Sequence, residues 1–354
     1  MKRQNTLTDL LGIHYPLIQA PMLGITTPAM VAAVSNQGGL GSLPVGGLSP
    51  EQTRTLLRET KAKTGKPFAV NLFAHSIPER IDEDQLTAMQ DFLEKFCREH
   101  DLPFTRRAAS AFQFHDYRDQ VDILLDEQIR VVSFTFGVLE QSVVDQLSQS
   151  GTVLVGTATS LEEALVLAGR GVHAVVAQGI EAGGHRGTFL DSSRLPQVGL
   201  FSLLPQLVEH LEQPVIAAGG IYDRKTVQAV FTLGASAAQI GSLFLVADES
   251  AAVEAQKKAV LASKSTDTVL TNAFTGRWAR GIRNRFMEAL EASGLALPDY
   301  TVQNSLTAPI RAYAQATNRA DFLSMWAGQS ASKSVRGSTA AIFNALVSSL
   351  DFDA

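Results

Sequence analysis

The segment GTVLVGTATSLEEALVLAGRGVHAVVAQG (residues 151–179) decides the fold, because it reads as two apolar strands joined by a helix. Residues 151–158 and 173–179 are short apolar runs of the kind that forms buried strands. Residues 160–171 between them have the periodicity of a helix, and Gly171 stands where glycine commonly ends one. Strands that are apolar along their whole length and are followed by helices are typical of a parallel sheet covered by helices.

The same pattern recurs along the chain. Eight such units within about 245 residues favour a closed (β/α)8 barrel of the α/β class, the TIM barrel, over an open doubly wound sheet. The eight apolar runs cover residues 16–22, 38–45, 67–74, 130–137, 151–158, 173–179, 214–220 and 237–245.

Two regions do not fit the repeat. Residues 75–128 are too long for one connection and contain the helical pattern DEDQLTAMQDFLEKFCREH, which predicts an inserted helical excursion. Residues 250–354 show no convincing strand and are expected to be helical throughout. We therefore expect a barrel over residues 1–249 with the insertion at about 75–128, and a helical cap over 250–354 packed on the barrel.

Composition limits the classes of function. The 354 residues are 45% hydrophobic and 18% charged with a net charge of −5, which fits a well-buried globular protein and not a nucleic-acid groove or an anionic membrane surface. No apolar run approaches the ~20 residues that span a bilayer. The single cysteine, Cys97, fits a reducing compartment, so we expect a cytoplasmic protein without nucleic-acid or membrane partners.

The candidate site is expected at the strand ends, where barrel enzymes carry their chemistry. These ends are rich in amides and glycine and poor in carboxylates, which favours a large heterocycle with a phosphate over a metal ion. Gly219-Gly220 ends the seventh run and Gly241-Ser242 lies in the eighth, where barrels commonly bind phosphate. Glycine lets backbone N–H groups approach phosphate oxygens closely. A single glycine-containing pair after a strand more often forms a simple turn, but two such pairs at the two expected strands favour a phosphate site.

The stretch QGIEAGGHRG (178–187) supplies the candidate catalytic residue, His185. It is the one histidine of seven that glycines place at the expected barrel mouth, where an imidazole can exchange protons near neutral pH. Four of the others fit structural or exposed positions, while His75 and His115 fall in the insertion. No paired-ligand spacing for zinc occurs, so we expect no metal site.

The segment GRWARGIRNRF (276–286) gathers four arginines. A solvated or salt-bridged surface is the commoner role for such a group, and the alternative is that one arginine reaches an anionic substrate or the cofactor phosphate. The four residues are Arg277, Arg280, Arg283 and Arg285.

Several stretches, in this order and spacing, resemble class I nitronate monooxygenases, formerly called 2-nitropropane dioxygenases, over essentially the whole chain. GRWARGIRNRF and the late MWAGQS belong to the likeness as well. The main stretches are IQAPMLGITTPAMVAAVSNQGGLGSL (18–43), VSFTFG (132–137), GTATSLEEALVLAGRGVHAVVAQGIEAGGHRG (156–187) and PVIAAGGIYDRKTVQAVFTLGASAAQIGSLFLVADES (214–250).

The resemblance implies a non-covalent FMN in the barrel and an oxidative denitrification of alkyl nitronates, such as propionate 3-nitronate, by O2. It implies a carbonyl product with nitrite and nitrate, a detoxifying role, and His185 facing the reactive edge of the flavin. By the same resemblance Asn71 and Gln178 would hydrogen-bond the flavin ring, and Gly183 would let the loop approach it. The other implied cofactor-binding residues are Gln19, Ala20, Pro21 and Met22 along the ring, and Gly219, Gly220, Gln239, Ile240, Gly241 and Ser242 at the phosphate.

A second family shares part of this pattern. Flavin-dependent enoyl-acyl-carrier-protein reductases, which use NAD(P)H, share the barrel, the EAGGH segment and the AAGGI loop. NLF at 71–73, VSFTFG and the C-terminal RGIRNRF with WAGQ resemble the monooxygenases instead. Thr135 stands where some relatives carry a second histidine, and Tyr300 could line the pocket from the cap. A homo-oligomer is possible.

Overall fold

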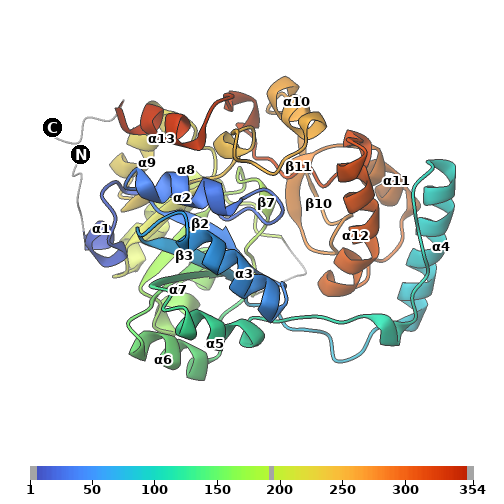
Figure 1. Ribbon diagram of the computed structural model, residues 1–354, viewed down its shortest axis with the longest axis horizontal. Coiled ribbons are helices and arrows are strands. Elements are labelled where there is room, and N and C mark those ends of the chain that lie inside the picture. The colour runs from blue at the N-terminus through green and yellow to red at the C-terminus, as the bar shows by residue number, and fades with distance from the viewer. Residues whose placement is uncertain (1–5, 191–194, 349–354) are drawn as a thin grey trace.

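The computed structural model describes residues 6–190 and 195–348, so the outer ends of the two expected domains (1–5 and 349–354) lie outside the described residues. The chain forms two lobes that lie side by side in Figure 1. One lobe contains the barrel, and the other contains an early helix packed against later parts of the chain.

The predicted barrel is confirmed. Its parallel strands follow the order β1-β9-β8-β6-β5-β4-β3-β2, and a parallel bridge between Ile18 and Leu40 joins the two ends of this sheet. The barrel strands are β1 (Leu17–Gln19), β2 (Gly41–Pro44), β3 (Phe68–Phe73), β4 (Val131–Thr135), β5 (Val153–Ala158), β6 (Ala174–Gln178), β8 (Val215–Ala218) and β9 (Ala237–Ile240).

Helices cover the outside of the barrel, while the second lobe holds α4 and α10 to α12 (Figure 1). The helices are α1 (Thr6–Leu11), α2 (Pro28–Asn36), α3 (Pro50–Lys61), α4 (Glu83–Glu99), α5 (Arg118–Asp126), α6 (Gln141–Gln149), α7 (Leu161–Gly169), α8 (Leu200–His210), α9 (Arg224–Thr232), α10 (Glu254–Ala262), α11 (Arg285–Ser293), α12 (Tyr300–Ala316) and α13 (Thr339–Ser348).

The strand–helix–strand segment of residues 151–179 folds as predicted. Ser160 caps α7 by accepting the backbone N–H of Glu163, and Gly171 follows the helix with a φ of 89°, which glycine adopts without strain. The Glu163 carboxylate accepts from the backbone and hydroxyl of Thr159 and from the Thr188 hydroxyl.

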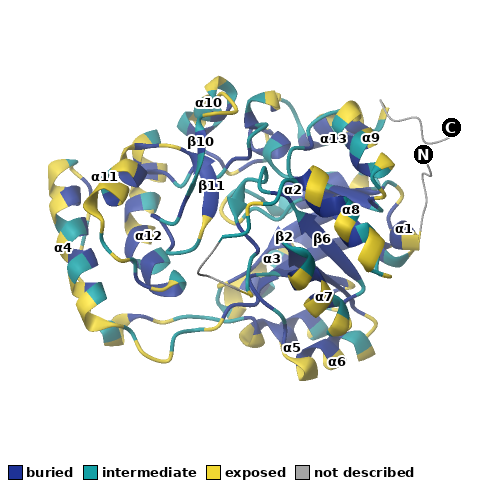
Figure 2. Ribbon diagram, turned by 180° about the vertical axis from the view of Figure 1, so that it is seen from behind, coloured by how far each residue is buried: buried dark blue, intermediate teal, exposed yellow. Residues whose placement is uncertain are grey.

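Alternation along the strands divides the barrel residues into two apolar clusters. Side chains that point inward, such as Ile18 and Val176, pack with Leu7 and Leu11, which α1 supplies at the end of the barrel away from the second lobe. Side chains that point outward pack against the helices, and Figure 2 shows this strand layer as buried. The inner cluster leaves the carboxyl ends of the strands for the site.

A further apolar cluster holds the second lobe together. The predicted insertion helix is confirmed as α4, and its buried residues pack against α11 and α12 from the end of the chain. Phe96 of α4 lies edge-on to Phe286 and Phe322, with ring centroids 5.4 and 5.8 Å apart. Cys97 is buried in the same cluster, as its helical position predicts.

The expectation that residues 250–354 are helical throughout was wrong. They contain β10 (Thr268–Thr271) and β11 (Ala279–Ile282), which pair antiparallel and continue to β7 (Gly184–His185) in a three-stranded sheet. These strands are short and include Arg280, so they lack the apolar run that marks the barrel strands.

The last helix leaves the second lobe and returns to the barrel. α13 packs against α2 and fills the helical position that follows β9, with Phe343 buried in the outer barrel cluster. A Cβ on Gly39 would lie 2.4 Å from the Phe343 ring, so a glycine is needed for this close approach. Among the described residues, no helix combines the length and apolar character needed to cross a membrane.

Candidate active site

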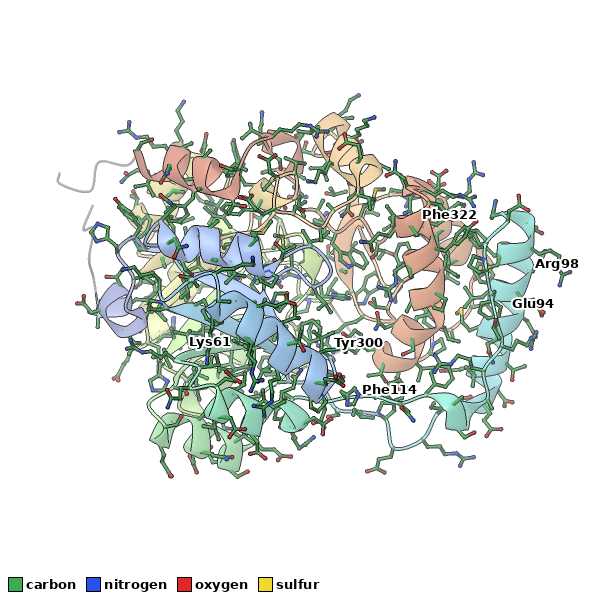
Figure 3. The ribbon with its side chains drawn as sticks, in the orientation of Figure 1. Lys61, Glu94, Arg98, Phe114, Tyr300 and Phe322 are labelled. Atoms are coloured by element: carbon green, nitrogen blue, oxygen red, sulfur yellow. The ribbon has the colours of Figure 1, made fainter. Side chains whose placement is uncertain are left out.

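A cavity of about 470 Å³ lies at the carboxyl ends of the barrel strands, between the two lobes. Its volume is typical of a site for a small molecule or cofactor. Figure 3 labels Tyr300 at the start of α12, on the side of the second lobe that faces the barrel. The predicted residues that line the cavity are Ala20, Pro21, Met22, Asn71, Gln178, Gly183, His185, Gly219, Gly220, Gln239, Gly241 and Ser242.

Two predicted residues do not line it. Gln19 is fully buried, and its side-chain amide bonds to Ala20 O, to Thr26 Oγ1 (3.0 Å) and to the backbone N–H of Ser42 (3.1 Å). Ile240 packs in the outer barrel cluster. Both side chains point outward because neighbours along a strand alternate, and the inward position in β9 belongs to Gln239.

The glycine loops after β8 and β9 leave backbone donors free. Gly219 and Gly220 have φ values of 118° and 69°, which side-chain-bearing residues rarely adopt. Within the described chain, the backbone N–H groups of Gly219, Gly220 and Gly241 have no hydrogen-bond acceptor. Ser242 Oγ accepts the backbone N–H of Gly328 at 2.9 Å and so joins this edge to the second lobe. Free N–H groups that converge on a cavity fit a phosphate.

The two predicted amides have different surroundings. Asn71 donates to Ser133 Oγ at 3.0 Å, and its Oδ1 has no partner among the described residues. Gln178 donates to the backbone oxygen of His185 at 3.0 Å and accepts from Gly187 N at 2.9 Å. Asn71 therefore offers a free acceptor to a heterocycle, whereas Gln178 holds the loop that carries His185.

Gly183 is required for backbone packing. A Cβ at this position would lie 2.4 Å from Gly328 N and 2.5 Å from Ala327 C, so only glycine lets the two segments touch. The sequence offered a different reason for this glycine, the approach of the loop to a cofactor. The structure shows that it also brings residues 326–330 of the second lobe against the barrel loop.

His185 is held by the small sheet and by Thr275. It pairs with Ala279 of β11, and its Nε2 lies 2.8 Å from Thr275 Oγ1. The Thr275 hydroxyl also donates to Arg277 O at 3.1 Å, so we infer that Nε2 carries the imidazole hydrogen. The other nitrogen, Nδ1, then presents a lone pair and has no partner among the described residues.

The surroundings of His185 keep it neutral. The rings of Phe136, Tyr300 and Trp326 lie 5.4, 5.9 and 5.3 Å from its ring. Burial, together with the smaller effect of the positive charges of Arg277 and Arg311, lowers the pKa of His185 to about 3. The imidazole is therefore uncharged at neutral pH, and it is the base form that faces the cavity.

Phe136, in the predicted VSFTFG segment, is a strained wall of the cavity. Its φ of 76° is rare for a bulky residue and is the kind of strain that clusters at functional sites. The guanidinium of Arg277 lies 4.3 Å from the centre of its ring and donates to Thr188 O and Phe136 O. Thr135, directly before it, also lines the cavity.

The four clustered arginines have two different roles. Arg283 and Arg285 are exposed, and Arg283 forms an ion pair with Glu291 at 3.2 Å, which is the commoner surface role. Arg280 is buried and donates to Ile180 O and Thr268 O. Burial also lowers the pKa of Arg277 to about 10.

Sequence reasoning missed several residues that line the cavity. His75 lies two residues beyond the end of β3, and that position near a strand end could have marked it as a site residue. It is buried, neither ring nitrogen has a partner among the described residues, and burial lowers its pKa to about 4. Asn304, Arg311 and Trp326 come from the second lobe, where no strand end marks them. No group of three potential metal ligands occurs in the described part of the chain.

Comparisons with known proteins agree with this arrangement. A sequence model of the nitronate monooxygenase family matches residues 4–349. A probable nitronate monooxygenase of Staphylococcus aureus is 40% identical over 331 residues, which cover 93% of this chain and 92% of the relative.

Two solved structures are similar over nearly the whole chain. A nitroalkane oxidase from Streptomyces ansochromogenes superposes with a TM-score of 0.88 at 35% identity and covers 98% of both chains. FabK from Thermotoga maritima has a TM-score of 0.75 at 26% identity, covering 98% of this chain and 96% of that one. Because the family model spans nearly the whole sequence and the Staphylococcus aureus relative matches over most of its length, the chain belongs to the nitronate monooxygenase family.

Proposed function

We propose that this flavin-dependent oxidoreductase binds FMN and uses O2 to oxidise alkyl nitronates such as propionate 3-nitronate, releasing a carbonyl compound with nitrite and nitrate. One observation carries the proposal: a neutral imidazole with a free Nδ1 lies in an aromatic pocket where two positive charges act on it. Such a pocket attracts a small anion and can accept a proton from its neutral acid. A detoxifying role in the cytoplasm follows as part of the same proposal.

The residues present fit FMN. The free backbone N–H groups of Gly219, Gly220 and Gly241 would hold its phosphate, and the Asn71 amide would contact its ring. The inward-facing Gln239 and the turn from Ala20 to Met22 complete this wall of the cavity. When bound, the flavin supplies the redox chemistry with the nitronate and O2.

The chain itself would bind, orient and shield the substrate. The charges of Arg277 and Arg311 favour the anionic nitronate over the neutral nitroalkane inside the cavity. Phe136, Tyr300 and Trp326 exclude water around His185, which strengthens those electrostatic interactions. When a neutral nitroalkane enters, His185 Nδ1 can take the proton from the carbon next to the nitro group, because the nitronate that forms beside it favours the protonated imidazole.

A paired assay tests the function. The enzyme loaded with FMN is expected to consume O2 and release nitrite from propionate 3-nitronate without NAD(P)H. Oxidation of NAD(P)H with an enoyl thioester, and no turnover of the nitronate, would establish the enoyl reductase activity instead. A protein that binds FMN but turns over neither substrate would overturn both assignments.

The role of His185 has its own readout. His185→Gln is expected to keep FMN bound and to lose turnover more severely with neutral nitroalkane than with preformed nitronate, because only the neutral substrate must give up a proton. Equal turnover by the variant and the unchanged enzyme on both substrate forms would show that His185 is structural.

A further inference from the structure

An arginine on the second lobe enters the cavity without a counter-ion. Arg311 of α12 lines the cavity, yet its hydrogen bonds go only to Thr307 and Asn304 of its own helix. None of the ion pairs within residues 6–190 and 195–348 includes it. Among the described residues, the carboxylate that lines the cavity is that of Glu181, and it accepts the backbone N–H of Leu200 at the start of α8.

The helix aims this charge at the cavity. Residues 300, 304, 307 and 311 recur at the spacing of one helical face. The guanidinium of Arg311 extends back along this face, because its Nη2 donates to both Asn304 O and Asn304 Oδ1 at 2.7 Å. Its Nη1 and the Asn304 Nδ2 have no partner among the described residues, so two donors remain free.

The charge lies within reach of His185. The guanidinium contacts residue 304, which is about 6 Å along the helix axis from Tyr300. The ring centroids of Tyr300 and His185 are in turn 5.9 Å apart. His185 and Arg311 line the same cavity, and the charge of Arg311 acts on the imidazole, so a small substrate at His185 lies within the field of Arg311.

The cost of an uncompensated charge indicates what this end of the cavity binds. Burial lowers the pKa of Arg311 to about 10, so the residue stays cationic at neutral pH although it is poorly solvated. A buried cation is strongly unfavourable unless an anion pairs with it. A carboxylate suits this position, because guanidinium and carboxylate groups match in geometry and bond strongly.

We propose that Arg311, together with Asn304, binds a second anionic group of the substrate, a carboxylate at the end away from the nitronate. Arg311 is thereby the residue that selects nitronates bearing a carboxylate over simple alkyl nitronates. This inference rests on the proposed nitronate oxidation and adds which residue binds the carboxylate end of the substrate.

Two matched substrates test the selection. Propionate 3-nitronate and propyl 1-nitronate have the same number of carbon atoms. At the end away from the nitronate, the first has a carboxylate and the second has a methyl group. Arg311→Gln is expected to lower the ratio of their kcat/KM values by about tenfold to a hundredfold, mainly by raising KM for the dianion. Arg311→Lys keeps the positive charge but lacks the planar guanidinium with its paired donors, so it should give an intermediate ratio of kcat/KM values. The control Arg283→Gln removes an exposed arginine of the same lobe and should leave the ratio unchanged.

An equilibrium measurement separates this inference from the proposed function. Succinate replaces the planar nitronate by a planar carboxylate, and butyrate lacks the second charge. Binding is measured by the change in flavin absorbance. Succinate is expected to bind the FMN-loaded enzyme more tightly than butyrate. Arg311→Gln and Arg311→Lys should both reduce this difference in affinity.

The outcomes are distinct. Failure of the unchanged enzyme to oxidise either nitronate would refute the proposed function, while succinate binding would still report on Arg311. Oxidation of both nitronates with an unchanged ratio in Arg311→Gln and Arg311→Lys would refute the role of Arg311 alone. Equal binding of succinate and butyrate would refute it as well.

Discussion

Replacing His185 by glutamine should make the protein more resistant to acid. The pKa of His185 falls from 6.5 to about 3 on folding, so between these values the unfolded chain binds a proton that the folded chain does not. Stability from this residue is therefore complete above pH 7.5 and is lost as pH falls through 6.5. At 1.36 kcal/mol per pH unit, the loss between pH 8 and pH 5 is about 2 kcal/mol.

The assay is urea unfolding at pH 8 and pH 5 with saturating flavin, for the unchanged protein and the variant. His185→Gln cannot titrate, so its free energy of unfolding should fall by about 2 kcal/mol less over this interval. His75→Gln should recover a similar amount, because burial lowers the pKa of His75 to about 4. His210→Gln, on the exposed end of α8, is the control. An identical fall in His185→Gln and the unchanged protein would refute the reasoning that burial keeps this imidazole neutral.

Three further predictions concern other positions. Gly183→Ala should lower the free energy of unfolding by about 1–3 kcal/mol in urea unfolding, because its Cβ would meet the backbone of residues 327–328. The control Gly65→Ala has open space around its Cβ and should leave the free energy of unfolding unchanged. Gly220→Ala should reduce the preference for FMN over riboflavin in equilibrium binding, and Gly171→Ala, with similar backbone strain far from the cavity, should leave it unchanged. Cys97 should react with a disulfide reagent at the rate of unfolding, because burial raises its pKa to about 11; fast reaction of the native thiol would contradict this.

The barrel was predictable because its strands carry their own signal. Each is a short run buried on both sides, and a run such as AVVAQ has no polar residue until its end at Gln178. The strands of the second lobe have no such signal. β11 contains Arg280, whose buried side chain is satisfied by backbone oxygens of distant residues, and the sequence alone does not show those partners.

The part of the candidate site that lies at the barrel strand ends was also predictable from the sequence. The sequence indicated the strand ends, and most of the residues found there line the cavity. Gln19 and Ile240 were assigned to the cofactor by the family resemblance, although alternation along a strand turns their side chains outward. Arg311 could not be found, because its importance lies in the absence of a counter-ion, which depends on what every other part of the chain places nearby.

The packing of α4 on the end of the chain has a consequence for biosynthesis. A ribosome makes α4 early, but its aromatic partners Phe286 and Phe322 emerge only after all eight barrel strands have been made. Until then the apolar face of α4 is uncovered and open to aggregation. The second lobe, and with it one wall of the cavity, must therefore be completed late. Shortened chains that end before α12 would contain the eight barrel strands but neither α13 nor a finished substrate pocket.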